Sequence, residues 1–111
     1  MKTLIIMISM SLTVMLVACS DDDGTKPGMT RDVQKGRGLY LANCVACHGN
    51  DPSRDGPIGP AIKGSSEELL RARVLTSNYP ANYRPKRPTK IMPQFPFLRD
   101  EIPKLAAYLN H

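Results

Sequence analysis

Residues 31–43 have the pattern of apolar and small positions that a helix shows when it buries one face. Such side chains recur at steps of three and four, the spacing that brings them to one side of an α-helix. Thr30 precedes the stretch and is suited to cap its N-terminus. Gly36 and Gly38 each cost about 1 kcal/mol relative to alanine inside a helix. We therefore expect a second helix to approach closely at Gly36.

Two more stretches predict helices further along the chain. Ser65-x-x-Glu68 has the form of a capping box, and the leucines and valine that follow give residues 65–76 an apolar face. Near the end of the chain, Asp100 is suited to cap a helix that carries Pro103 in its first turn. The pattern predicts an all-α domain with three main helices.

The segments between these helices are rich in glycine and proline. The chain of 111 residues holds 10 prolines and 8 glycines, and they are dense in residues 49–64 and 77–90. A domain of this size has a thin core and usually needs a staple such as a metal or a cofactor. The composition therefore predicts long loops, and a large bound group would explain how so loop-rich a chain folds.

The N-terminus has the features of a bacterial export signal. Lys2 precedes an apolar run over residues 4–18 that is short for a bilayer span. The run ends Leu-Val-Ala-Cys, which resembles the lipobox of bacterial lipoproteins, where the signal is cut before a cysteine that carries lipid. We expect residues 1–18 to be a lipoprotein signal peptide, Cys19 to be lipidated and residues 19–29 to be a flexible tether. An ordinary signal peptide and an uncleaved anchor are the alternatives.

Charge is distributed unevenly along the chain. The formal net charge is +5, and removal of the leader lowers it by one. Residues 69–98 contain six lysines and arginines but no aspartate or glutamate. This stretch would either steer an acidic partner or merely solvate exposed loops. Nucleic acid is not an expected partner, because no interleaving of aromatic residues for base stacking stands out and an exported protein rarely meets nucleic acid.

Residues 44–48 carry the chemistry around which the domain is organised. Cys44 and Cys47 stand three apart and His48 follows directly, which is the attachment signature of a c-type haem. Two thiols at this spacing can form thioethers with the two vinyl groups of the porphyrin, and the next residue offers an imidazole to the iron. A zinc knuckle or a redox-active dithiol is the alternative use of Cys-x-x-Cys.

Together with Gly36 and Tyr40, this motif resembles the first helix and haem-binding segment of small class I cytochromes c. The resemblance runs over about residues 30–110, and we expect the domain to span 30–111. It implies an all-α fold in which three main helices and long Pro/Gly-rich loops surround one haem c. It also implies that the C-terminal helix crosses the first helix at Gly36, with Tyr40 packed at the same crossing.

The resemblance also assigns a partner to the histidine. In that family a Gly-Pro-x-Leu segment supplies a proline carbonyl to the second ring nitrogen of the proximal histidine. Residues 59–62 look like this segment, so Pro60 is expected to orient His48, and Pro57 is the rival. Such a partner fixes the tautomer and the orientation of the ring.

The distal ligand of the iron is expected to be Met92. Of the six methionines, four lie in the expected signal and Met29 in the expected tether, which leaves Met92 alone downstream of the motif. Thioether sulfur is a soft donor suited to Fe(II), and it raises the haem potential relative to two histidines. Met-Pro in this place is also how the family presents its sixth ligand. Core packing is the alternative role of Met92, and His111 is the alternative ligand.

These features predict a non-catalytic redox protein. It would be a membrane-tethered monohaem cytochrome that passes single electrons between protein partners, one of them with an acidic docking surface. The domain would be monomeric and would face the periplasm or another extracytoplasmic space of a bacterial envelope. One alternative is a gas sensor or small haem enzyme with an open or labile sixth iron position. Another is an accessory subunit inside a fixed complex.

Overall fold

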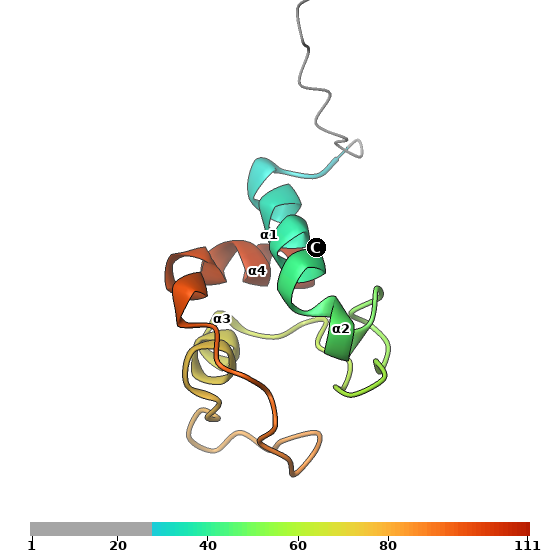
Figure 1. Cartoon of the computed structure of the whole chain (residues 1–111). Coiled ribbons are helices and arrows are strands. Elements are labelled where there is room, and N and C mark those ends of the chain that lie inside the picture. Colours follow the sequence, from blue (N-terminus) through green and yellow to red (C-terminus); the bar gives the residue numbers. More distant parts are fainter. Residues whose placement is uncertain (1–27) are drawn as a thin grey trace, which may run out of the picture.

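A computed structural model of the protein describes residues 28–111, and these residues form helices and loops with no strand among them (Figure 1). In chain order the elements are α1 (Arg31–Asn43), α2 (Val45–His48), α3 (Glu67–Leu70), the π-helix η1 (Arg71–Leu75), the 3-10 helix η2 (Pro96–Glu101) and α4 (Ile102–Leu109). The expected all-α fold is confirmed, with two short helical turns, α2 and η2, added to the three main helices.

The expected signal peptide of residues 1–18, the expected lipidation site Cys19 and most of the expected tether lie outside the described residues. Within residues 28–111, no helix has the length and apolar character needed to cross a membrane.

Helix α1 begins where the sequence predicted. The hydroxyl of Thr30 accepts a hydrogen bond from the amide of Val33 at 3.3 Å, and Thr30 itself has the extended backbone of an N-cap residue. The inward face of the helix consists of Val33, Gly36 and Tyr40, which are buried. The predicted periodicity therefore describes this helix correctly.

Helix α4 packs directly on α1 at Gly36. A Cβ added to Gly36 would overlap the backbone carbonyl of Lys104 and lie 2.9 Å from Cβ of Tyr108. Beside this contact the rings of Tyr40 and Tyr108 lie 5.4 Å apart between centroids, with their planes tilted by 50°. The close approach at Gly36 is confirmed. Nothing lies within 4 Å of a Cβ added to Gly38, so that second glycine has no such packing reason.

The second helix begins one residue later than expected. Ser66 is the N-cap, and its hydroxyl accepts from the amide of Leu69 at 3.1 Å. The expected capping box at Ser65 was wrong, because the Ser65 hydroxyl donates instead to the carbonyl of Ile62 at 2.6 Å. Helix α3 continues directly into η1, so the two form one helical segment.

The expected cap of the last helix was also wrong. Asp100 lies inside η2, and α4 follows Glu101 without a capping side chain. An N-cap residue normally has an extended backbone, whereas Glu101 is already in the helical region at φ −99° and ψ −7°. Since η2 runs straight into α4, there is no extended residue to cap. Pro103 sits in the first turn, as predicted.

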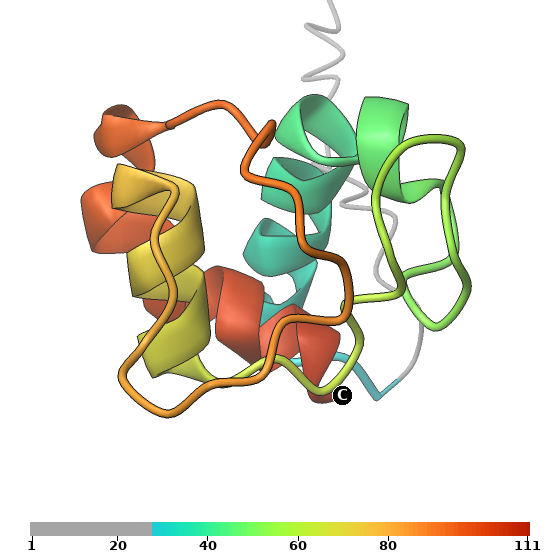
Figure 2. The ribbon, with the colours of Figure 1, turned by 90° about the horizontal axis from the view of Figure 1, so that it is seen from below.

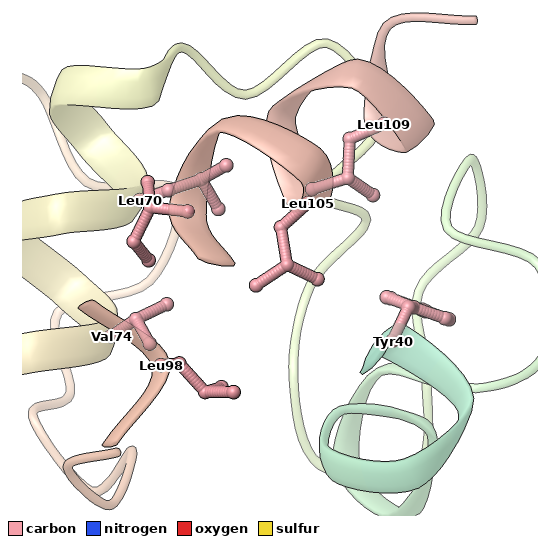
Figure 3. Packing of buried hydrophobic residues seen from close by; sticks show 7 residues of the cluster. Tyr40, Leu70, Val74, Leu98, Leu105 and Leu109 are labelled. Carbon is pink, nitrogen blue, oxygen red and sulfur yellow. The ribbon is translucent and has the colours of Figure 1, made fainter. Parts of the chain in front are cut away.

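The apolar core is small and is built from all the main helices. Figure 3 shows side chains of α1, α3, η1, η2 and α4 directed toward a shared interior. Its buried members are Tyr40, Leu70, Val74, Leu98, Ile102, Leu105 and Leu109. In the turned view, the long segment between η1 and η2 runs across one face of the helices (Figure 2). The loops thus lie over a thin helical core, as the composition predicted.

Candidate cofactor site

The Cys-x-x-Cys-His motif begins at Cys44, which joins α1 to α2, and its other four residues form α2. The amides of Cys47 and His48 both point at the carbonyl of Cys44, at 3.2 and 2.9 Å, which winds the motif into a single turn. Gly49 ends this turn with φ +77°, a left-handed value that suits glycine. The turn brings both half-buried thiols and the imidazole to the same region of the protein, and the thiols are not joined in a disulfide.

The His48 ring is buried and held at one nitrogen. The residue is 7% exposed, and its Nδ1 atom lies 2.8 Å from the carbonyl oxygen of Pro60. A carbonyl can only accept, so this contact assigns the proton to Nδ1 and leaves the lone pair on Nε2 free for a metal. Pro57, the rival partner, is exposed and does not line the cavity that contains the ring.

Two glycines allow the following loop to pack against the motif. A Cβ added to Gly59 would lie 2.5 Å from Cε1 and 2.6 Å from Nδ1 of His48. A Cβ added to Gly56 would overlap the backbone of Cys47 and His48. The amide of Gly59 also donates to the carbonyl of Cys47 at 2.8 Å. The loop after the motif therefore returns against the motif, and only glycine fits at these two positions. The density of glycines in the sequence indicated a loop but did not identify this steric role.

Tyr40 braces the end of the motif from the core. Its hydroxyl donates to the carbonyl of Gly49 at 2.6 Å, and the ring is fully buried. Burial, aided by the nearby Cys44 thiol, raises the pKa of Tyr40 to about 12. The hydroxyl therefore keeps its proton, and so its hydrogen bond, throughout the physiological pH range.

One large cavity collects the residues that the sequence singled out. Cys44, Cys47, His48, Pro60 and Met92 all line it. The space amounts to about 1070 Å³ including its opening to solvent. Its remaining walls come from the loops on either side of α3 and η1 and from leucines and a valine of α3, η1 and α4.

Met92 lies on the segment that crosses this cavity. The Ser77 hydroxyl donates to the Met92 carbonyl at 2.8 Å, and the amide of Phe95 donates to the carbonyl of Val74 at 2.7 Å. These two contacts fasten Met92 and the residues that follow it to η1 and to the residues just beyond η1, and Met92 is half-buried. The alternative ligand, His111, is exposed and does not line the cavity.

A stack of three side chains forms part of the wall and was not predicted. The rings of Tyr79 and Tyr83 are parallel within 8°, with centroids 5.5 Å apart, and the guanidinium of Arg73 lies 4.2 Å from the Tyr79 centroid. All three residues line the cavity. No sequence signal pairs them, because the stack depends on how the loop after η1 turns.

The donor set favours a large planar group over a bare ion or a redox dithiol. Among residues 28–111, no three Cys, His, Asp or Glu side chains converge to hold a metal ion, whereas a structural zinc site needs four ligands. A redox-active cysteine has a lowered pKa, whereas burial raises the pKa of the Cys44 thiol to about 11. The residues fit a haem, because two thiols and one imidazole border a large and mainly apolar cavity.

Comparisons with known proteins agree with this geometry. The family model described as Cytochrome c matches residues 33–111, from the first turn of α1 to the C-terminus. A similar protein, described as Cytochrome c-553-like and coming from Synechocystis sp., is 32% identical over 79 residues. The alignment covers 71% of this chain and 68% of that relative.

Proposed function

Because the chain belongs to the cytochrome c family, we propose that it is a monohaem electron carrier whose iron is ligated by His48 and Met92. Haem-based electron transfer is the function of the family, and a covalently attached haem c is its cofactor. In the proposal, Cys44 and Cys47 form the two thioether bonds.

The convergence of the motif and Met92 on one cavity is the observation that carries this proposal. His48 and Met92 come from segments more than forty residues apart, and they border the same space. When bound, haem c supplies a one-electron ferric/ferrous couple. The chain then has two tasks, which are to hold the iron between two protein ligands and to keep other molecules off the sixth position.

The contacts of the chain suit these tasks. Pro60 holds the proton on Nδ1 of His48, which keeps Nε2 available and the ring fixed. Ser77 holds the backbone of Met92. A thioether ligand favours Fe(II) and raises the potential. The site would therefore change charge without binding a substrate.

Visible spectroscopy of the haem-loaded protein tests this assignment. The ferrous wild type should show a c-type spectrum that carbon monoxide does not change, because both axial positions are filled. Met92→Ala should bind carbon monoxide readily. Met29→Ala, the matched control, removes a methionine that does not line the cavity, so it should behave like the wild type.

A ferrous wild type that binds carbon monoxide as readily as Met92→Ala would refute the closed site. The open-position sensor or enzyme would then be the better description. Absence of a haem spectrum would contradict the cofactor assignment itself.

We further propose that the carrier is anchored outside the cytoplasm by lipid on Cys19. The apolar leader and the lipobox-like ending support this, although both lie outside the described residues. Cys19→Ser should move the protein from the membrane fraction to the soluble fraction, and the neighbouring Ser20→Ala should not. Equal membrane retention of both variants would count against the anchor.

We also propose that the redox partner has an acidic docking surface. Two exposed isoleucines, Ile58 and Ile91, stand at the rim of the cavity, 54% and 72% exposed. Basic residues dominate positions 69–98, and three of them, Arg73, Lys86 and Arg87, line the same cavity. Such positive charge accelerates encounters with an acidic partner at low salt. Oxidation of the ferrous protein by anionic ferricyanide should slow as ionic strength rises, and oxidation by cationic tris(phenanthroline)cobalt(III) should not slow. Equal salt dependence of the two would contradict steering.

A further inference from the structure

The two loops that border the cavity are joined to each other by a pair of basic side chains. The first loop, residues 49–66, contains Pro60, and the second, residues 76–95, contains Met92. Arg87 on the second loop donates to the carbonyl of Ile58 at 2.7 Å. It also donates to the carboxylate of Asp55 at 3.1 Å.

Lys86 makes the neighbouring contact. Its ammonium donates to the carbonyl of Ala61 at 2.7 Å, directly after Pro60 in sequence. Figure 2 shows the orange segment crossing from the side of α3 toward the yellow-green loop that it meets. The two loops therefore meet at the rim, close to the proline that contacts His48.

Asp55 ties the same contact back into its own loop. Its second carboxylate oxygen accepts from the amide of Ala61 at 2.8 Å. The amide of Gly56 donates to the carbonyl of Gly59 at 2.9 Å. Residues 55–61 are thus a small closed loop that packs against the motif, and Arg87 is fastened to it at two points.

The hydrogen bonds of Lys86 and Arg87 hold the middle of the second loop, which carries Met92. Among the described residues, the hydrogen bonds that residues 84–91 make to the rest of the chain come from Lys86 and Arg87 alone. The segment carries no helix that would hold it otherwise. Loss of Arg87 would leave the residues just before Met92 with one remaining attachment.

We propose that Arg87 and Asp55 are positioning residues that form a clasp between the two loops and so hold Met92 over the iron. This inference rests on the proposed ligation by Met92. The clasp acts on how easily the sixth position opens. Arg87 lines the same cavity, and the hydrogen bonds of the clasp go to Ile58 and Ala61 rather than to the motif. The rigid two-point fork of arginine suits the role, because it binds a carbonyl and a carboxylate at the same time.

Imidazole binding to the ferric, haem-loaded full-length protein in detergent measures this opening. Arg87→Met removes both donors while it keeps the apolar stem. An exposed ion pair and one further hydrogen bond together change an equilibrium by about three- to tenfold. We expect imidazole to bind Arg87→Met three- to tenfold faster than the wild type. Arg84→Met makes the same change in the same loop at an exposed residue outside the clasp, and it should stay within about 1.5-fold of the wild type.

Asp55→Asn separates the ion pair from the rest of the clasp. The asparagine oxygen can still accept from Ala61, so only the charged contact to Arg87 is weakened. We expect a smaller increase, about two- to threefold, and salt should raise the wild-type rate toward that of Asp55→Asn because the pair is exposed and screened. In the double variant with Arg87→Met the two effects should not add, since both changes remove one interaction.

The outcomes distinguish the clasp from the ligand assignment. If the wild type binds imidazole as fast as Met92→Ala, both the closed site and the clasp are overturned. If the wild type is closed but Arg87→Met matches Arg84→Met, the clasp alone is overturned. Purely additive effects of Asp55→Asn and Arg87→Met would overturn it as well. Should Arg87→Met not accumulate with haem, Asp55→Asn and its salt dependence give the same test.

Discussion

The same substitution at two positions of α1 should have opposite effects on stability. Gly36 and Gly38 stand two residues apart in one helix, and Gly→Ala favours a helix by about 0.5–1 kcal/mol where there is room. Nothing lies within 4 Å of a Cβ at position 38, so Gly38→Ala should stabilise the protein by that amount.

At position 36 the new methyl group meets the backbone of α4. The Lys104 carbonyl and Cβ of Tyr108 cannot move aside as the end of a flexible side chain would, so the two helices must separate. Overpacking of this kind costs about 1–3 kcal/mol, and a backbone obstacle puts the cost in the upper part of that range. After the gain in helix propensity, Gly36→Ala should be destabilised by about 1–2 kcal/mol.

Guanidinium unfolding of the ferric holoprotein, followed by far-ultraviolet circular dichroism, gives the comparison. The midpoints of the two variants should move to opposite sides of the wild-type midpoint, with unchanged slope. The difference in free energy of unfolding between them should be about 1.5–3 kcal/mol. If Gly36→Ala proves as stable as Gly38→Ala, the reasoning about the crossing is refuted.

Three further predictions concern the site and the second helix. Gly59→Ala should push the His48 ring away from the Pro60 carbonyl, which lowers the basicity of the ligand and so raises the reduction potential of the haem. An unchanged potential in protein-film voltammetry would contradict this steric role of Gly59. Burial raises the pKa of Tyr40 from its usual 10 to about 12, so its contribution to stability is complete below pH 10 and is lost as the pH rises to 12. The wild type should therefore lose stability relative to Tyr40→Phe across that window, by roughly 1–2 kcal/mol once the Cys44 thiol is consumed by haem attachment, and a constant difference in unfolding free energy would contradict this. Ser66→Ala should lower the unfolding free energy by about 1 kcal/mol, because α3 loses its N-cap. An unchanged midpoint in denaturant titration would count against that cap.

The sequence predicted those features of the fold that depend on local signals. The cap at Thr30 and the face of α1 depend on residues within one or two turns, and both are present. The two adjacent serines before α3 show where local reasoning ends. Ser65 donates to Ile62, and its carbonyl accepts from Asn110 on the far end of the chain, so tertiary contacts decide which serine is left to cap.

The site divides in the same way. The spacing of the motif brought its three side chains to one turn, because they are neighbours in the chain. The contact between Asp55 and Arg87 spans 32 residues and depends on the path of two irregular loops, for which no periodicity exists. The steric need for glycine at position 59 also became visible only with the ring of His48 in place.

The polar partners in the cavity help to explain why this site suits electron transfer. The two buried polar side chains at the motif, His48 and Tyr40, both bond to backbone carbonyls, those of Pro60 and Gly49. Carbonyls have no proton to lose, so these partners keep the same charge at any physiological pH. Among the described residues that line the cavity there is no aspartate or glutamate, and His48 is the single histidine. The two hydrogen bonds that hold the motif therefore keep the same charge beside a bound iron at any physiological pH, which suits its one-electron couple.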